Sequence, residues 1–244
     1  LAIQIFRDEH PKKFLHQLVS GQLDMDRMDY LNRDSFFTGV HEGVIGYDRI
    51  IKMLSVCDGE LVVEEKGIYS IEKFLIARRL MYWQVYLHKA VLSAEQMLVQ
   101  TFRRARDLVR EGYNLRATEN LEFFLHHHLT ESDFEAQRDV LLERFAVLDD
   151  YDIMAALKSW MHAEDKLLAY FSKSLINRRL FKLELRNDPF EADYVKNIRG
   201  KVEKWNAFPA ELTDYLVFGG QETNSAYSTS KDEIKILHKD GRVL

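Results

Sequence analysis

A long tract with few helix-breaking residues constrains this sequence most. The chain has only three prolines, at positions 11, 189 and 209, so none interrupts residues 12–188. Between Ile71 and Arg110, apolar residues recur every three or four positions, which is the period of an amphipathic helix. Gly112 follows where such a helix would end. We therefore expect one long helix here, or two in series, within a mainly α fold.

Further helices are expected on both sides of this tract. A capping-box pattern at Thr130 and Asp133, and an acidic pair at Asp149 and Asp150, favour two of them. The alternating sequence ELVVEEKGIYS (60–70) predicts a short hairpin with Gly67 at its turn. The expected helices cover residues 11–20, 24–37, 45–56, 134–148 and 151–176.

The pattern changes after Asn177. Residues 178–185, 214–220 and 232–244 are rich in β-forming residues, and a helix is expected from Asp188 and Pro189 through Trp205. Together these elements predict a small C-terminal α+β module of βαββ order. The polar run 219–232 predicts a loop between its strands.

Composition narrows the function classes. With 46% hydrophobic and 30% charged residues among 244, the chain is typical of a globular protein. Its net charge of -5 provides no overall positive field that would attract nucleic acid or anionic lipid. A single cysteine, Cys57, excludes an internal disulfide, and the first residues hold no apolar run suited to a signal peptide or membrane span. We therefore expect a cytoplasmic protein without a membrane partner. Both ends look cut, because the chain begins with Leu and its last residues resemble the opening of a strand.

The segment LDMDRMDYLNRDS (23–35) is the most informative part of the sequence. On a helix, Asp26, Tyr30 and Asp34 share one face, with Arg27 one step around it. Apolar side chains lie away from that face, which favours a helix held by a core with its charged side toward a cavity. An ordinary solvated face with i,i+4 partners remains the alternative.

A second set of polar side chains lies on the long helical tract. Arg78, Tyr82, Tyr86 and Lys89 share a narrow face there. Two cations separated by tyrosines suit an anionic ligand with a flat ring, because cations bind phosphate and tyrosine can stack on a base or hydrogen-bond a sugar. Exposed side chains on an ordinary helix surface would give the same pattern.

The two segments together resemble the HD-domain dNTP triphosphohydrolases, a family that includes bacterial dGTPase-like phosphohydrolases. GQLDMDRMDYLNRDSFFTGV matches the string D-x-D-[RK]-x-D-Y-x-x-R-D, and RRLMYWQVYLHKAV matches R-x-x-x-[YH]-x-x-x-Y-x-H-K. The resemblance implies the back half of an HD-domain helical core in residues 1–112, a helical extension in 113–176 and an HD-associated α+β module in 177–244.

The resemblance also implies roles for individual residues. Asp26 would be a ligand of a divalent metal ion (Mg, Mn or Fe) and thereby catalytic. The other residues would bind the substrate: Arg27 and Arg78 at the triphosphate, Tyr30 and Asp34 at the deoxyribose, with Asp34 at its 3′-hydroxyl, and Tyr82, Tyr86 and His88 around sugar and base, next to Lys89. Tyr82 stands where some members have histidine.

This chain departs from the family pattern at the metal site. The family's ligands are His, His-Asp and Asp in that order, and the 244 residues contain no His-Asp dipeptide. The resemblance places the earlier ligands upstream, so these residues alone are expected to be inactive. The consecutive His126, His127 and His128 do not replace them, because a helix would spread them 100° apart.

Hydrolysis of dNTPs to deoxynucleoside and triphosphate is the activity that the resemblance implies for the intact protein. Two alternatives stay open, namely an HD-type hydrolase of another nucleotide and an inactive fragment that serves regulation or oligomerisation. The resemblance also implies a homo-oligomer, dimeric or tetrameric. A basic run at Arg103, Arg104, Arg106 and Arg110 leaves nucleic acid as a further partner, with a solvated helix face as the alternative.

Overall fold

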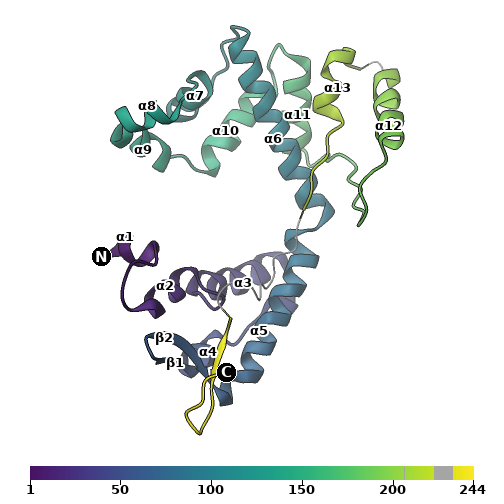
Figure 1. Cartoon of the computed structure of the whole chain (residues 1–244). Coiled ribbons are helices and arrows are strands. Elements are labelled where there is room, and N and C mark those ends of the chain that lie inside the picture. The colour runs from purple at the N-terminus through teal and green to yellow at the C-terminus, as the bar shows by residue number, and fades with distance from the viewer. Residues whose placement is uncertain (206, 223–232) are drawn as a thin grey trace. The chain divides into compact units, whose positions relative to one another are not determined.

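The structure is a computed structural model that describes residues 1–205, 207–222 and 233–244. The chain divides into two compact units, residues 1–88 with 222–244 and residues 89–221 (Figure 1). Both units are built mainly from helices, and the described strands form one small sheet. The expected mainly α fold with a small α+β part is confirmed.

The expected segments 1–112, 113–176 and 177–244 do not coincide with these units. Helix α6 (Lys89–Arg110) belongs to the second unit, whereas the last described residues belong to the first. As an assignment of domains, the expected segments stay a prediction.

Helices and a three-stranded sheet make up the first unit. In the sheet, β2 lies between β1, which runs antiparallel to it, and β3, which runs parallel to it. The elements are α1 (Ala2–Phe6), α2 (Lys13–Ser20), α3 (Met25–Thr38), η1 (His41–Gly43), α4 (Tyr47–Met53), β1 (Leu54–Cys57), β2 (Glu60–Glu64), η2 (Glu65–Gly67), α5 (Ile68–Met81), η3 (Tyr82–Tyr86) and β3 (Lys235–Leu237).

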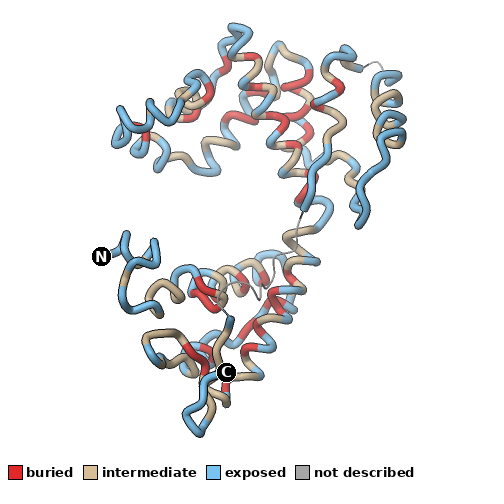
Figure 2. The backbone as a smooth tube through the Cα atoms, viewed as in Figure 1, coloured by how far each residue is buried: buried red, intermediate tan, exposed pale blue. Residues whose placement is uncertain are grey.

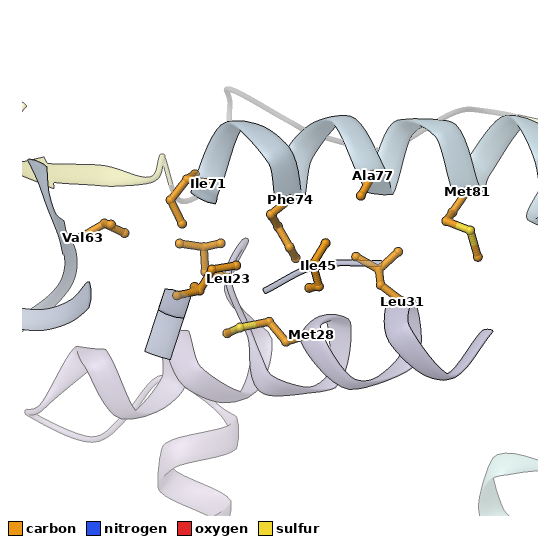
Figure 3. Close-up of a cluster of buried hydrophobic side chains, with 10 residues drawn as sticks. Leu23, Met28, Leu31, Ile45, Val63, Ile71, Phe74, Ala77 and Met81 are labelled. Carbon is orange, nitrogen blue, oxygen red and sulfur yellow. The ribbon is translucent and has the colours of Figure 1, made fainter. Parts of the chain in front are cut away.

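Helices α3 and α5 pack around the core of this unit. The Asp24 side chain caps α3 by accepting a hydrogen bond from the Arg27 amide at 2.8 Å, and Gly39 ends the helix in a left-handed conformation. Figure 3 shows Met28 and Leu31 of α3 facing Phe74 and other side chains of α5. The helix predicted over residues 24–37 is therefore confirmed, with its charged side left outside the core.

The predicted hairpin forms, but it is displaced toward the N-terminus. Its strands are β1 and β2, and its turn is at Asp58 and Gly59, which both have positive φ (51° and 81°). This is the geometry of a tight Asp-Gly hairpin turn. The placement of the turn at Gly67 was wrong, and so was the extension of a helix to Val56. Gly67 instead ends η2, where a Cβ would lie 2.8 Å from a methyl carbon of Val63.

The second unit is helical in its described part. Its elements are α6 (Lys89–Arg110), α7 (Glu119–His126), α8 (Glu131–Ala136), α9 (Arg138–Ala146), α10 (Asp150–Trp160), α11 (Lys166–Ile176), α12 (Ala192–Trp205), η4 (Ala210–Leu212) and α13 (Thr213–Leu216). The predicted capping box at Thr130 is present, and Asp149, predicted only as part of an acidic pair before a helix, forms a second capping box at the start of α10. Buried residues gather along α6, α10 and α11, as Figure 2 shows.

The long helical tract forms two helices in series, which is one of the two forms predicted for it. Between α5 and α6 lies η3, a π-helical turn. The tracts 134–148 and 151–176 are each divided into two helices, and the second division coincides with Asp165, whose side chain caps α11.

Most of the strands predicted near the C-terminus do not form. Residues 178–185 form no strand, and residues 214–216 lie in α13. Phe181 bonds instead to side chains of α6, because its amide donates to Met97 Sδ at 3.2 Å and its carbonyl accepts from Ser93 Oγ at 2.8 Å. The helix through Trp205 is confirmed but begins at Ala192, and β3 forms but pairs with β2 in the first unit. Most of the loop expected over 219–232 lies outside the described residues.

Candidate functional site

The predicted site residues of the first unit lie on three elements, α3, α5 and the turn η3 that directly follows α5. Arg27, Tyr30 and Asp34 follow one another on α3, and Arg78 lies in the last turn of α5. Tyr82 and Tyr86 begin and end η3, the π-helical turn. Such single π-turns are frequent at functional sites, because they redirect side chains relative to an α-helix.

The three tyrosine rings contact one another edge to face. The centroid of Tyr86 lies 6.0 Å from that of Tyr30 and 5.3 Å from that of Tyr82. The Tyr86 hydroxyl donates a hydrogen bond to Asp34 Oδ2 at 2.8 Å. Burial, followed by this hydrogen bond, raises the pKa of Tyr86. These contacts join α3 to η3 and keep a protonated phenol beside a carboxylate.

The two arginines are close enough to influence each other and the phenols. Burial and then the charge of Arg78 lower the pKa of Arg27. Burial raises the pKa of Tyr30, while the charges of Arg78 and Arg27 oppose that rise. We call Arg27, Tyr30, Asp34, Arg78, Tyr82 and Tyr86 the tyrosine–arginine cluster. It combines two cations, a carboxylate and three aromatic rings; Arg78 is buried and the other five residues are partly buried.

Polar groups just before α3 hold both arginines. Arg27 Nη1 pairs with Asp24 Oδ2 and donates to the Gly21 carbonyl at 2.7 Å. Arg78 Nη1 donates to Gln22 Oε1 at 3.1 Å. Sequence reasoning assigned no role to Gly21, Gln22 or Asp24. The position of Asp24 before a helix was a signal for capping, but no pattern pointed to Gln22.

Asp26 lies in the first turn of α3 and is exposed. Its charge contributes to the raised pKa of Tyr30, which places it near the cluster. Among residues 1–205, 207–222 and 233–244, no group of three or more His, Cys, Asp or Glu side chains could hold a metal ion. The assignment of Asp26 as a metal ligand stays a prediction.

His88 and Lys89 follow the last residue of the cluster closely in the sequence, but they belong to different units. His88 follows η3, is exposed, and is the last residue of the first segment of the first unit. Lys89 is the first residue of α6 and belongs to the second unit. Their substrate-binding roles stay predictions.

The other clusters singled out from the sequence have local partners. His127 stacks on Phe123, with ring centroids 4.2 Å apart, and its Nδ1 lies 2.8 Å from the Phe123 carbonyl. In the basic run, Arg104 pairs with Asp165 at 2.8 Å, and Arg110 pairs with Asp107 at 3.4 Å. These ion pairs reduce the positive charge that the run offers to a nucleic acid. The described helices also include none long and apolar enough to cross a bilayer.

Comparison with known proteins adds evidence of a different kind. Residues 45–123 match the family described as the HD associated region. A crystal structure of a phosphohydrolase from Bacteroides thetaiotaomicron shares 50% identity and a TM-score of 0.91, over 100% of this chain and 60% of that one. The chain is related to the HD-superfamily phosphohydrolases. This HD-type relationship agrees with the motifs on α3 and α5 that carried the resemblance.

The chain is also similar to two proteins in sequence. The Bacillus subtilis protein YwfO is 33% identical over 179 residues, which are 73% of this chain and 39% of YwfO. A Dictyostelium discoideum homolog of the deoxynucleoside triphosphate triphosphohydrolase SAMHD1 is 28% identical over 102 residues, which are 41% of this chain and 20% of the homolog. The chain spans less than two thirds of each of these relatives.

Proposed function

We propose that this HD-type chain supplies the nucleotide-binding side of a metal-dependent phosphohydrolase that converts dNTPs to deoxynucleoside and triphosphate. The observation that carries the proposal is the tyrosine–arginine cluster. There, a hydrogen-bonded Tyr86–Asp34 pair, suited to a sugar, lies near two guanidinium groups suited to phosphates.

The arginines favour a polyphosphate over a neutral ligand. Two like charges repel each other, and a polyanion that contacts both replaces this repulsion with attraction. Guanidinium groups also donate paired hydrogen bonds to phosphate oxygens. Arg27 and Arg78 would therefore orient the triphosphate and stabilise the charge that develops on it.

The tyrosines and Asp34 fit a deoxyribose. Tyr86 uses Oδ2 of Asp34, and a carboxylate can accept further hydrogen bonds at its other oxygen. A 3′-hydroxyl would donate there, next to the Tyr30 ring. The Tyr86 ring would pack against C2′, where a ribose hydroxyl would meet an apolar edge.

A divalent ion would have to be held by Asp26 together with ligands other than the described residues. A metal ion held there would supply an activated water as the nucleophile. The residues described here would bind the nucleotide and orient it. A homo-oligomeric state remains part of the proposal and rests on the resemblance alone.

The test uses the purified gene product that contains this sequence, with dNTPs, rNTPs, dNMPs and cyclic nucleotides in the presence of Mg²⁺ or Mn²⁺. Release of triphosphate from dNTPs, with little turnover of rNTPs, is the expected result. Asp26→Ala should abolish turnover, and Asp34→Ala should raise KM for dNTPs at least tenfold. Asp29→Ala is the matched control, because Asp29 lies on the same helix and pairs with exposed Arg33. Preferred hydrolysis of another nucleotide class, or full activity of Asp26→Ala, would contradict the proposal.

A further inference from the structure

The segment between α2 and α3 has a tightly defined conformation. The Gly21 amide donates to the Gln17 carbonyl at 2.9 Å, and a Cβ on Gly21 would lie 2.4 Å from that same oxygen. Leu23 is buried in the core between α3 and α5 (Figure 3). Because burial holds Leu23 in place, the backbone of its neighbours Gln22 and Asp24 is also held in place.

Asp24 combines two contacts in a buried position. It is only 3% exposed, caps α3 through the Arg27 amide, and pairs with Arg27 Nη1. The Gly21 carbonyl accepts from the same nitrogen. Within the described part of the chain, Nε and Nη2 of Arg27 have no acceptor. These two nitrogens form the planar fork that binds an oxyanion in a bidentate manner.

Gln22 holds the second arginine from the same segment. Arg78 is 3% exposed, and its Nη1 donates to Gln22 Oε1. A buried guanidinium keeps one orientation only where acceptors define it. Gln22 is neutral, so this hydrogen bond adds no negative charge beside the Arg78 guanidinium.

We propose that Gln22 and Asp24 are positioning residues that hold Arg78 and Arg27 in place and thereby make the cluster selective for polyphosphate over a single phosphate. This role rests on the proposed function, and the ligand feature that the site would recognise is a chain of linked phosphates. One phosphate is satisfied by one guanidinium, whereas a chain of phosphates gains from both only if both are already oriented. Loss of these acceptors would leave the two guanidinium groups less ordered, and ordering them on binding would reduce the affinity for the polyphosphate.

The experiment is isothermal titration calorimetry of the 244-residue chain with sodium tripolyphosphate and, separately, orthophosphate, in EDTA. The variants are Gln22→Met, which removes the acceptor at similar size and unchanged charge, and Asp24→Asn, which keeps a good helix cap and removes the charge. We expect each variant to reduce the preference for tripolyphosphate over orthophosphate about tenfold. A purely structural role would weaken both ligands by the same factor.

Asp24→Asn also tests the sign of the effect. If Asp24 acted only as a negative charge near the phosphates, its loss would strengthen binding of both anions, whereas a positioning role requires weaker tripolyphosphate binding. The matched controls are Gln17→Met, since Gln17 bonds to the Leu61 amide at 2.7 Å, and Asp29→Asn on the outer side of α3. Both controls should keep the wild-type preference.

An unchanged preference in either folded variant would overturn the inference, as would equal binding of both ligands by the wild type. Circular dichroism identifies a variant that does not fold, and the other variant then decides. If the binding preference does not change in the variants, the positioning role is rejected, while hydrolysis of dNTPs by the gene product is still decided by its own assay. Failure of hydrolysis with a normal tripolyphosphate preference would instead reject the activity and keep the positioning role.

Discussion

The hydrogen bond between Tyr86 and Asp34 predicts a specific response to alkali. Burial and this bond raise the pKa of Tyr86 above its usual 10.0, so the folded chain favours the protonated phenol. Its contribution to stability is complete below about pH 10 and is lost as the pH rises through the higher folded pKa. Tyr86→Phe should therefore lose stability less steeply than the wild type above pH 10, measured by urea unfolding between pH 8 and 11. The exposed Tyr69 gives the control, because Tyr69→Phe should follow the wild-type curve. Parallel curves for the wild type and Tyr86→Phe would contradict the assignment.

The Arg104–Asp165 pair predicts a large loss of stability on truncation. Its side chains are only 11% and 12% exposed, and Asp165 also caps α11 through the Leu168 amide at 2.7 Å. Arg104→Met leaves the Asp165 charge without this partner, so the free energy of unfolding should fall by about 3 kcal/mol. Arg110 provides the comparison, because its side chain is 59% exposed and Arg110→Met should cost less than about 0.5 kcal/mol. Equal losses in chemical denaturation would show that burial of the Arg104 pair is unimportant.

At the scale of elements, η1 packs closely against α3 and α5 at Gly43. A Cβ there would lie 2.6 Å from Met81 Sδ and 2.9 Å from Ser35 Cβ, which are on α5 and α3. Gly43→Ala should therefore destabilise the fold by roughly 1–3 kcal/mol, because these helices must shift. Gly200 lies inside α12 with open space around its Cβ position, so Gly200→Ala should stabilise by about 0.5–1 kcal/mol. Thermal unfolding measures both, and a gain on Gly43→Ala would contradict the packing.

The elements that sequence predicted best are those whose ends are set locally. Asp24 and Gly39 bound α3, and the capping boxes at Thr130 and Asp149 begin α8 and α10, because a side chain bonds to backbone only a few residues away. Strand formation lacked such local determinants. Residues 178–185 have strand-like composition, but Met97 and Ser93 of α6 satisfy the Phe181 backbone instead of a neighbouring strand. A β propensity describes what fits a half-buried sheet, not which partner is present.

At the scale of the whole chain, a mutation in β3 should destabilise the first unit and leave the second unit unchanged. Ile236 pairs with Val63 and packs against the first unit's core, although it lies far along the sequence. Ile236→Ala should therefore cost about 2 kcal/mol and increase hydrogen exchange in β1 and β2 but not in α10 and α11. Ile153→Ala is the reciprocal control, because Ile153 packs against the core of the second unit. Equal increases in both units after Ile236→Ala would contradict the division.

By itself, the sequence determined that the chain is mainly helical, where α3 begins and ends, and which residues of α3 and α5 share a face. Helical period and caps act over a few residues, so they are legible without the fold. Only the tertiary structure decided that Tyr86 bonds to Asp34, that Gln22 and Asp24 hold the arginines, and that β3 joins β2. These contacts join residues from different elements or depend on how buried side chains turn, and both follow from packing of the whole core rather than from local pattern.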